Sequence, residues 1–310
     1  MPSCHVSPQS AWHILLTTAP RQALTRLMGV VAFCFSAAMT MPSTAFAQVL
    51  SPQPTPALVE GIVWQLDNES VDIRGNWQDI GAKRLLIQWL SVDGTSFVAD
   101  TEQPTAPRLP DWSRIAAEPW AQEVIVGLAG RFDETAARAD VSNLIAHSVR
   151  LAKLPTPLNV VGWYFPVEID SSWNDAKKLA PLLSSLPRPL WVSVYDSANI
   201  GAEPLAQWLA SWLPEDVGLL FQDGVGVHAR TAPVARMYAD VLSRRFGKAR
   251  VSMIVEAFRP VAKTGFRSAT RDELNEQLAA YQGLSTYLFD GPHYVTDALV
   301  RELQTPVKKP

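Results

Sequence analysis

The chain has 310 residues, of which 47% are hydrophobic, and its 27 basic and 30 acidic residues give a formal net charge of −3. This length and this apolar content are sufficient for a large core. A slightly acidic chain lacks the excess of positive charge that binds a phosphate backbone, so we expect no nucleic acid among its partners.

The N-terminal residues have the features of a signal peptide. Arg21 and Arg26 precede an apolar stretch over residues 27–41, and Ala45-Phe46-Ala47 supplies a small-x-small cleavage site. We predict cleavage after Ala47, which makes residues 1–47 a signal peptide and the mature protein periplasmic or secreted. The apolar stretch is short for a membrane span, so we expect no stable membrane insertion after cleavage. An uncleaved N-terminal anchor is the alternative.

The predicted cleavage also decides the cysteine chemistry. Both cysteines of the chain, Cys4 and Cys34, lie in the predicted signal peptide. The mature chain would then contain no thiol, which excludes a cysteine nucleophile and cysteine-ligated metals. Residues 48–56 contain three prolines and are predicted to form a linker.

Eight short apolar runs follow the linker and predict eight strands. The runs are rich in β-branched and aromatic residues and show little strict alternation, which is typical of strands buried on both faces. The predicted strands are residues 61–66, 84–90, 123–128, 160–165, 190–195, 217–221, 250–255 and 285–289.

The stretches between these runs have a helical period. One helix is predicted from residue 133 to about residue 153, a second over 233–246, and a third after a capping box that starts at Thr270. Alternating strands and helices predict a parallel sheet, and eight units favour a single (β/α)8 TIM barrel over residues 57–305. An open doubly wound sheet is the alternative fold. Residues 306–310 are predicted to be a tail.

Two glutamates stand at the ends of two of these runs. Glu168 follows the fourth predicted strand, and Glu256 follows the seventh. In a barrel both positions belong to the rim where the βα-loops build active sites. Glycoside hydrolysis requires two carboxyl groups on either side of the scissile bond. We therefore predict that Glu168 and Glu256 are the catalytic residues.

The other side chains near the strand ends are amides, aromatics and acids, which suit a sugar because its C–H faces stack on rings and its hydroxyls form hydrogen bonds. Core packing is the alternative for a tryptophan within a strand, and helix capping is the expected role of Asp170. The ends lack clustered histidines, so no metal and no other cofactor is predicted. The predicted substrate-binding residues are Gln65, Gln88, Trp89, Tyr164, Trp173, Tyr195, Gln222, Asp223 and Asp290.

Three motifs carry a family resemblance. Trp163-Tyr-Phe-Pro-Val-Glu-Ile-Asp170, Gln222-Asp-Gly-Val-Gly226 and Val255-Glu-Ala-Phe258 resemble a bacterial family known as domain of unknown function 4434. The resemblance implies a TIM-barrel protein similar to glycoside hydrolases, and to the wider glycosidase clan that uses an acid/base on strand four and a nucleophile on strand seven. That clan usually places Asn before its strand-four Glu, whereas Val167 stands here. The missing amide would come from Gln222 or Gln88, or is absent.

These observations lead to a mechanistic hypothesis. We predict a retaining glycoside hydrolase of a bacterial envelope polysaccharide or exopolysaccharide, in which Glu256 attacks the anomeric carbon and Glu168 is the acid/base. Retention requires the carboxyls to be about 5 Å apart, whereas about 7–9 Å would imply inversion through a water. We expect burial and the charge of Glu256 to raise the pKa of Glu168.

A protein of another class is the alternative. A non-catalytic glycan-binding or assembly factor in polysaccharide export could keep the cleft and lose the chemistry. Two acids in an open cleft would favour an enzyme, whereas one acid in a packed core, or paired with Arg259, would favour a binding protein. The sequence does not predict the oligomeric state.

Overall fold

The structure is a computed structural model that describes residues 57–99, 101–261 and 265–305. The predicted signal peptide (1–47), linker (48–56) and tail (306–310) lie outside the described residues.

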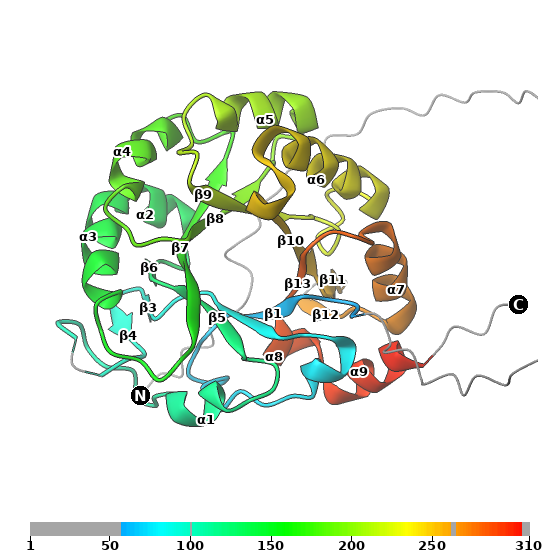
Figure 1. Cartoon of the computed structure of the whole chain (residues 1–310), viewed down its shortest axis with the longest axis horizontal. Helices are drawn as coiled ribbons and strands as arrows, with labels where there is room; N and C mark the ends of the chain where they lie inside the picture. The colour runs from blue at the N-terminus through cyan, green and yellow to red at the C-terminus, as the bar shows by residue number, and fades with distance from the viewer. Residues whose placement is uncertain (1–56, 100, 262–264, 306–310) are drawn as a thin grey trace, which may run out of the picture. The chain divides into compact units, whose positions relative to one another are not determined.

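Eight parallel strands close into a barrel, which confirms the predicted (β/α)8 fold (Figure 1). The first strand in the chain pairs with both the second and the last barrel strand, so the sheet has no free edge. In chain order the barrel strands are β1 (Gly61–Trp64), β2 (Arg84–Ile87), β5 (Glu123–Gly127), β7 (Val160–Asp170), β8 (Leu190–Tyr195), β9 (Val217–Gln222), β10 (Val251–Glu256) and β13 (Thr286–Phe289).

Strand β7 differs most from its prediction. It continues past the predicted end at Phe165 as far as Asp170, and its register against β8 shifts between Phe165 and Ile169. Pro166 has no backbone N–H to donate to a ladder, and prolines within strands are confined to edges and bulges. Glu168 therefore lies in the irregular part of the strand rather than after its end.

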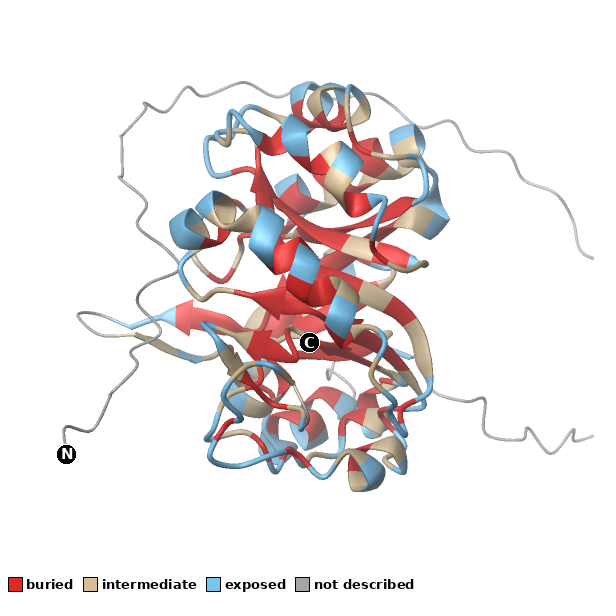
Figure 2. Ribbon diagram, turned by 90° about the vertical axis from the view of Figure 1, so that its left-hand side faces the viewer, coloured by how far each residue is buried: buried red, intermediate tan, exposed pale blue. Residues whose placement is uncertain are grey.

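Helices form a layer around the barrel, with buried inner faces and exposed outer faces (Figures 1 and 2). The capping box at Thr270 is present, as predicted. The helices are α1 (Trp112–Ala116), α2 (Glu134–Ala139), α3 (Val141–Leu151), α4 (Leu179–Leu183), α5 (Ala202–Ala210), α6 (Ala232–Phe246), α7 (Arg271–Ala280), α8 (Gly291–Tyr294) and α9 (Asp297–Gln304), with 3-10 turns η2 (Trp77–Ile80), η3 (Ala176–Lys178) and η4 (Lys248–Arg250).

The single helix predicted over residues 133–153 is wrong, because the segment forms α2 and α3 with a break at Asp140. The carboxylate of Asp140 accepts hydrogen bonds from Arg131 and from the side chain of Asn143. An aspartate that bonds to local polar groups favours a helix end over a helix interior. The break ends α2 as a short helix whose first residue is Glu134.

Two small sheets stand on the C-terminal side of the barrel strands. The first contains β3 (Ser91–Val92), β4 (Thr95–Ser96) and β6 (Ala129–Gly130), and the second is the hairpin of β11 (Phe258–Pro260) and β12 (Phe266–Ser268). They follow β2, β5 and β10 in the chain, so they extend the wall of the barrel at the end where its loops meet.

The core has two parts. A small cluster fills the inside of the barrel, and a larger cluster lies between the barrel and the helices. A packed interior is expected of a barrel of this size, because side chains from alternate strands fill it in layers. The inner cluster consists of Val63, Leu86, Ile125, Tyr164, Leu220, Ile254 and Tyr287.

Close strand packing gives a testable prediction at Gly127. A Cβ added there would lie 2.1 Å from the backbone oxygen of Gln88, so the backbone would have to move. We expect Gly127→Ala to lower the free energy of unfolding by about 2–3 kcal/mol, measured by urea denaturation.

The control is Gly94→Ala. A Cβ at Gly94 would meet nothing within 4 Å, but the residue has φ +76°, so only backbone conformation opposes the change. We expect a loss of about 1 kcal/mol. Equal losses in the two variants would contradict the packing argument.

Candidate active site

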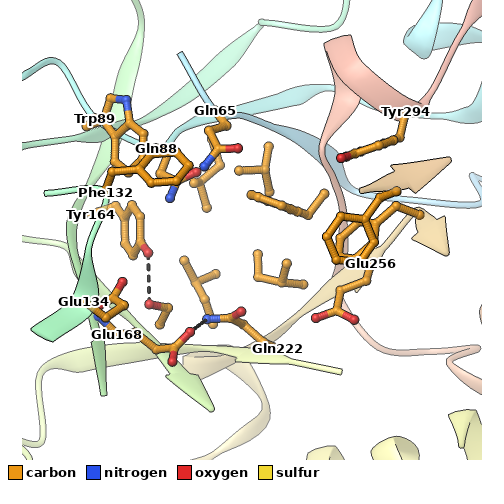
Figure 3. Close-up of a pocket in the computed structure, with 18 of the residues that line it drawn as sticks. Gln65, Gln88, Trp89, Phe132, Glu134, Tyr164, Glu168, Gln222, Glu256 and Tyr294 are labelled. Atoms are coloured by element: carbon orange, nitrogen blue, oxygen red, sulfur yellow. Dashed lines mark hydrogen bonds between the residues drawn. The ribbon is translucent and has the colours of Figure 1, made fainter. Parts of the chain in front are cut away.

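Glu168 and Glu256 both line one cavity at the C-terminal end of the barrel (Figure 3). The cavity has a volume of about 100 Å³. An engineered protein cavity of about 150 Å³ admits one benzene ring, so the enclosed part has room for little more than a portion of one sugar unit. Five of the predicted substrate-binding residues also line it: Gln65, Gln88, Trp89, Tyr164 and Gln222.

Glu168 is fixed by contacts from two directions. Its Oε2 accepts a hydrogen bond of 2.7 Å from the side-chain amide of Gln222, and its Oε1 lies 3.7 Å from the guanidinium of Arg138. Its backbone N–H donates to Oε2 of Glu134 at 3.0 Å. The side-chain amide of Gln222 thus lies beside the carboxyl of Glu168, although it comes from a different strand.

The surroundings of Glu168 favour its protonated form. Burial raises its pKa, and the charge of Glu134 raises it further. The hydrogen bond from Gln222 and the charge of Arg138 lower the pKa by less, so it ends well above its ordinary value. A carboxyl that holds a proton near neutrality is suited to general acid catalysis. The neighbouring charge with the largest effect is Glu134, whereas we expected Glu256.

Glu256 is the last residue of β10 and is 1% exposed. Its Oε2 accepts a hydrogen bond of 3.1 Å from the backbone of Val227, and Oε1 receives none from the described residues. A Cβ at Gly226 would lie 2.8 Å from Oε2, so the loop can wrap this carboxyl only because a glycine stands there. Burial raises the pKa of Glu256, and the charge of Asp223 acts in the same direction.

Asp223 supports Glu256 and does not line the cavity. It is fully buried, and one of its oxygens accepts a hydrogen bond of 3.3 Å from the backbone N–H of Glu256. The other oxygen accepts hydrogen bonds from the side chains of Gln277 and Tyr281. This network positions the end of β10, and we assign Asp223 to it instead of to the substrate.

Three further predicted residues lie outside the cavity lining. Trp173 is half-buried, and its ring lies under the guanidinium of Arg138 at 5.6 Å. Tyr195 is buried, and the guanidinium of Arg230 lies 5.0 Å from its ring. Asp290 is fully buried and accepts hydrogen bonds from the backbone of Gln65 and from the backbone N–H of His293. The structure thus places none of these three residues in the cavity lining.

Asp170, which we expected to cap a helix, accepts hydrogen bonds from the backbone of two loops. Its carboxylate accepts the backbone N–H groups of Ser172 and Ser197, each at 2.8 Å. Asp170 therefore ties together the loops that follow β7 and β8.

Sequence reasoning missed Glu134 and most of the aromatic residues of the cavity. Glu134 is the first residue of α2, and the acids there were interpreted as a helix start, which concealed their position beside the site. Phe132 lies in a loop, Phe258 and Phe266 come from the hairpin β11–β12, and Phe289 and Tyr294 end β13 and α8. No local sequence pattern indicates that these side chains face the cavity. The missed residues are Arg131, Phe132, Glu134, Phe258, Phe266, Phe289 and Tyr294.

No group of three or more His, Cys, Asp or Glu side chains among residues 57–99, 101–261 and 265–305 is arranged to hold a metal ion. Within the same ranges, no helix has the length and apolar character needed to span a bilayer.

Comparison with known proteins supports the fold. No family model and no curated protein matches the chain. A solved structure from Bacteroides thetaiotaomicron VPI-5482, described as a candidate alpha-L-fucosidase, is similar with 15% identity and a TM-score of 0.50, over 84% of this chain and 96% of that chain. The glycoside hydrolase domain of PgaB (BpsB) from Bordetella bronchiseptica has 12% identity and a TM-score of 0.47, over 80% of this chain and 100% of that chain.

These identities are low, so the likeness to the Bacteroides structure extends to the fold alone. The chain thus has a barrel fold of the kind found in glycoside hydrolases.

The rim contains a histidine with a strongly shifted pKa. His293 bonds to Asp290 through Nδ1 at 2.9 Å and lies 3.3 Å from Asp67 through Nε2. The bond to Asp290, followed by that to Asp67, raises the pKa of His293 to about 10. Burial alone would raise the pKa of Asp67, but its bond to His293 and its other hydrogen bonds lower it to about 2.

We predict that His293→Gln destabilises the protein in a pH-dependent manner. The proton on His293 stabilises the fold fully below the pKa of an unfolded histidine, about 6.5, and this contribution is lost as the pH rises toward 10. The difference in free energy of unfolding between wild type and variant should therefore be largest near pH 5–6 and decline toward pH 10. Denaturant titrations across this range measure it, and a difference that grows with pH would contradict the assignment.

Proposed function

We propose that the protein is a glycoside hydrolase in which Glu168 protonates the leaving oxygen and Glu256 is the second carboxyl. The observation that carries the proposal is the placement of both acids on one cavity, at the end of the barrel where the βα-loops meet, in a lining that also contains amide and aromatic side chains. The raised pKa of Glu168 supports its role as the acid, because a general acid must hold its proton until the bond breaks.

The surroundings of the two acids support inversion more than the retention expected from the sequence. The neighbouring charge that raises the pKa most is that of Glu134 for Glu168 and that of Asp223 for Glu256, so the two acids do not act mainly on each other. Figure 3 shows the side chain of Gln222 between the two acids, and its amide bonds to Glu168.

The state of Glu256 agrees with the role of a general base. Glu256 accepts the proton in its ionised form, and the raised pKa makes that carboxylate a stronger base than an ordinary glutamate. Its Oε1, which receives no hydrogen bond from the described residues, is available to a water molecule. In the proposed reaction the water oxygen bonds to the anomeric carbon, its proton passes to Glu256, and the proton of Glu168 passes to the departing glycosidic oxygen.

The remaining lining groups suit a saccharide. Oε1 of Gln88 is buried and has no hydrogen-bond partner among the described residues, so it can accept a bond from a sugar hydroxyl. The indole N–H of Trp89 donates to the backbone of Leu66 at 2.7 Å, which leaves the ring itself for contact with a substrate. We propose a polysaccharide of the bacterial envelope or an exopolysaccharide as the substrate, reached after export by the predicted signal peptide. Membership of the domain of unknown function 4434 family remains part of this proposal.

One observation favours the non-catalytic alternative. Glu256 is almost fully buried, as a structural acid would be. Its carboxyl is not paired with Arg259, however, because that guanidinium donates to the backbone oxygens of Glu256 and Phe258 and to Gln277. A glycan-binding or assembly factor would bind the polysaccharide and leave it intact.

We predict that Glu168→Gln and Glu256→Gln each lower kcat by about 10²–10⁴-fold, because each removes one proton transfer. Activity would be screened against a panel of bacterial exopolysaccharides. Since glutamine can keep the hydrogen bonds to Gln222 and Val227, we expect Tm to change by less than about 3 °C.

The matched control is Glu276→Gln, an exposed acid on α7 that does not line the cavity, and it should leave turnover unchanged. Unfolding of both active-site variants would mark the acids as structural.

The anomer first formed, followed by NMR, distinguishes the retaining from the inverting route. Release of the anomer that keeps the configuration of the substrate would contradict the inverting route.

A further inference from the structure

The first turns of α2 contact Glu168 at two points. Glu134 and Arg138 are four residues apart, so they lie on the same face of the helix. Oε2 of Glu134 accepts the backbone N–H of Glu168, and Arg138 donates to the backbone oxygen of Glu168 at 3.0 and 3.2 Å. Figure 3 shows Glu134 beside Glu168 on the same wall of the cavity. The helix is therefore held against the proposed acid by both of its charged side chains.

We propose that Glu134 is a positioning residue for Glu168: the two acids titrate as one coupled pair, and Arg138 balances the negative charge that the pair carries. The proposal rests on the function proposed above, in which Glu168 must be protonated before the glycosidic bond breaks. The proposal gives α2 a role in that reaction, whereas the sequence predicted this segment only as part of a helix between two strands.

The physical reason for coupled titration is repulsion in a poorly solvated site. Two neighbouring acids cannot both ionise easily away from water, so the second proton is held more tightly. Burial raises the pKa of Glu134 as well as that of Glu168, and the charge of Glu134 is the strongest neighbouring influence on Glu168. Protons of such a pair leave in two steps that belong to the pair rather than to either residue.

Arg138 lowers the pKa values that burial raises. Its guanidinium lies 3.7 Å from Oε1 of Glu168 and lowers the pKa of both acids. The arginine is held over the ring of Trp173, which limits its movement. The pair can therefore carry one negative charge after a proton has left, which is the state that follows proton donation to a leaving group. The other ionisable groups that act on the pair or face it are Asp133 and Arg131 beside α2, Tyr164 and Asp170 on β7, and Tyr195 on β8.

The test is an NMR titration of side-chain carboxyl carbons in protein labelled with 13C at Cδ of glutamate, and it needs no substrate. The signal of Glu168 is assigned by its loss in Glu168→Gln. In the wild type we expect Glu168 and Glu134 to titrate in the same two steps. Glu134→Gln keeps an acceptor for the backbone N–H of Glu168 but removes the charge. In this variant Glu168 should titrate in one step, with its midpoint lowered by about one pH unit.

Arg138 provides the opposing variant. Arg138→Gln removes the positive charge, so the midpoint of Glu168 should rise by about one pH unit, whereas Arg138→Lys should stay closer to the wild type. Glu134→Asp keeps the charge, so it should preserve two-step titration. It replaces Glu134→Gln as the test of the pair if that variant does not fold. Glu276→Gln on α7 controls for the loss of a distant charge and should leave the midpoint unchanged.

A merely structural role for Glu134 has a different signature. In that case Glu134→Gln would lower Tm while the midpoint of Glu168 stayed within about 0.3 pH unit of the wild type, and this result would overturn the proposal. Shifts in the same direction in Glu134→Gln and Arg138→Gln would also overturn it. Because the titration reports protonation and not turnover, an absence of hydrolase activity would count against the proposed function and leave this inference standing.

Discussion

Hydrogen bonding between the first and last barrel strands is the constraint on which the site depends. β1 pairs with β13 on one side and with β2 on the other, so the sheet closes and its C-terminal strand ends surround one opening. Only this closure brings Gln65, Glu168 and Glu256 to the same cavity, since they lie far apart in the chain. If the sheet were open, the residues after its first and seventh strands would be separated by the width of the sheet.

The chemistry of the cavity follows from how little water reaches its acids. Transfer of an ionised carboxylate from water into a protein interior costs several kcal/mol, and neutralisation by a proton avoids much of that cost. The cavity lies above an apolar barrel interior, so Glu134, Glu168 and Glu256 are all shifted toward their protonated forms. Asp223 is shifted in the same direction, although Gln277 and Tyr281 donate hydrogen bonds to it. Protonated carboxyls therefore lie close to where the glycosidic oxygen would accept a proton in the proposed reaction.

The fold could be predicted because its signals are local. Each barrel strand is a short apolar run, and the predicted range 190–195 is identical to β8. The break at Asp140 and the bulge after Phe165 were not predicted. The carboxylate of Asp140 bonds to Arg131 in the preceding loop, and the bulge is defined by the register of β7 against β8.

The candidate site was only partly predictable for the same reason. Residues at or near strand ends, such as Gln222 at the end of β9 and Glu168 in the last part of β7, could be placed at the rim from strand position alone. Whether a side chain there faces the cavity depends on partners distant in sequence, as for Tyr195 beneath Arg230 and Asp290 beside His293. Glu134 shows the converse case, because its helix-start position suggested only a local role.

The central claim is that burial keeps the carboxyl of Glu168 protonated at neutral pH. Infrared difference spectroscopy between the wild type and Glu168→Gln tests this directly, since protonated and ionised carboxyl groups absorb at separate frequencies. We expect the variant to lose the band of a protonated carboxylic acid at neutral pH. Loss of a carboxylate band instead, with the acid band unchanged, would contradict it.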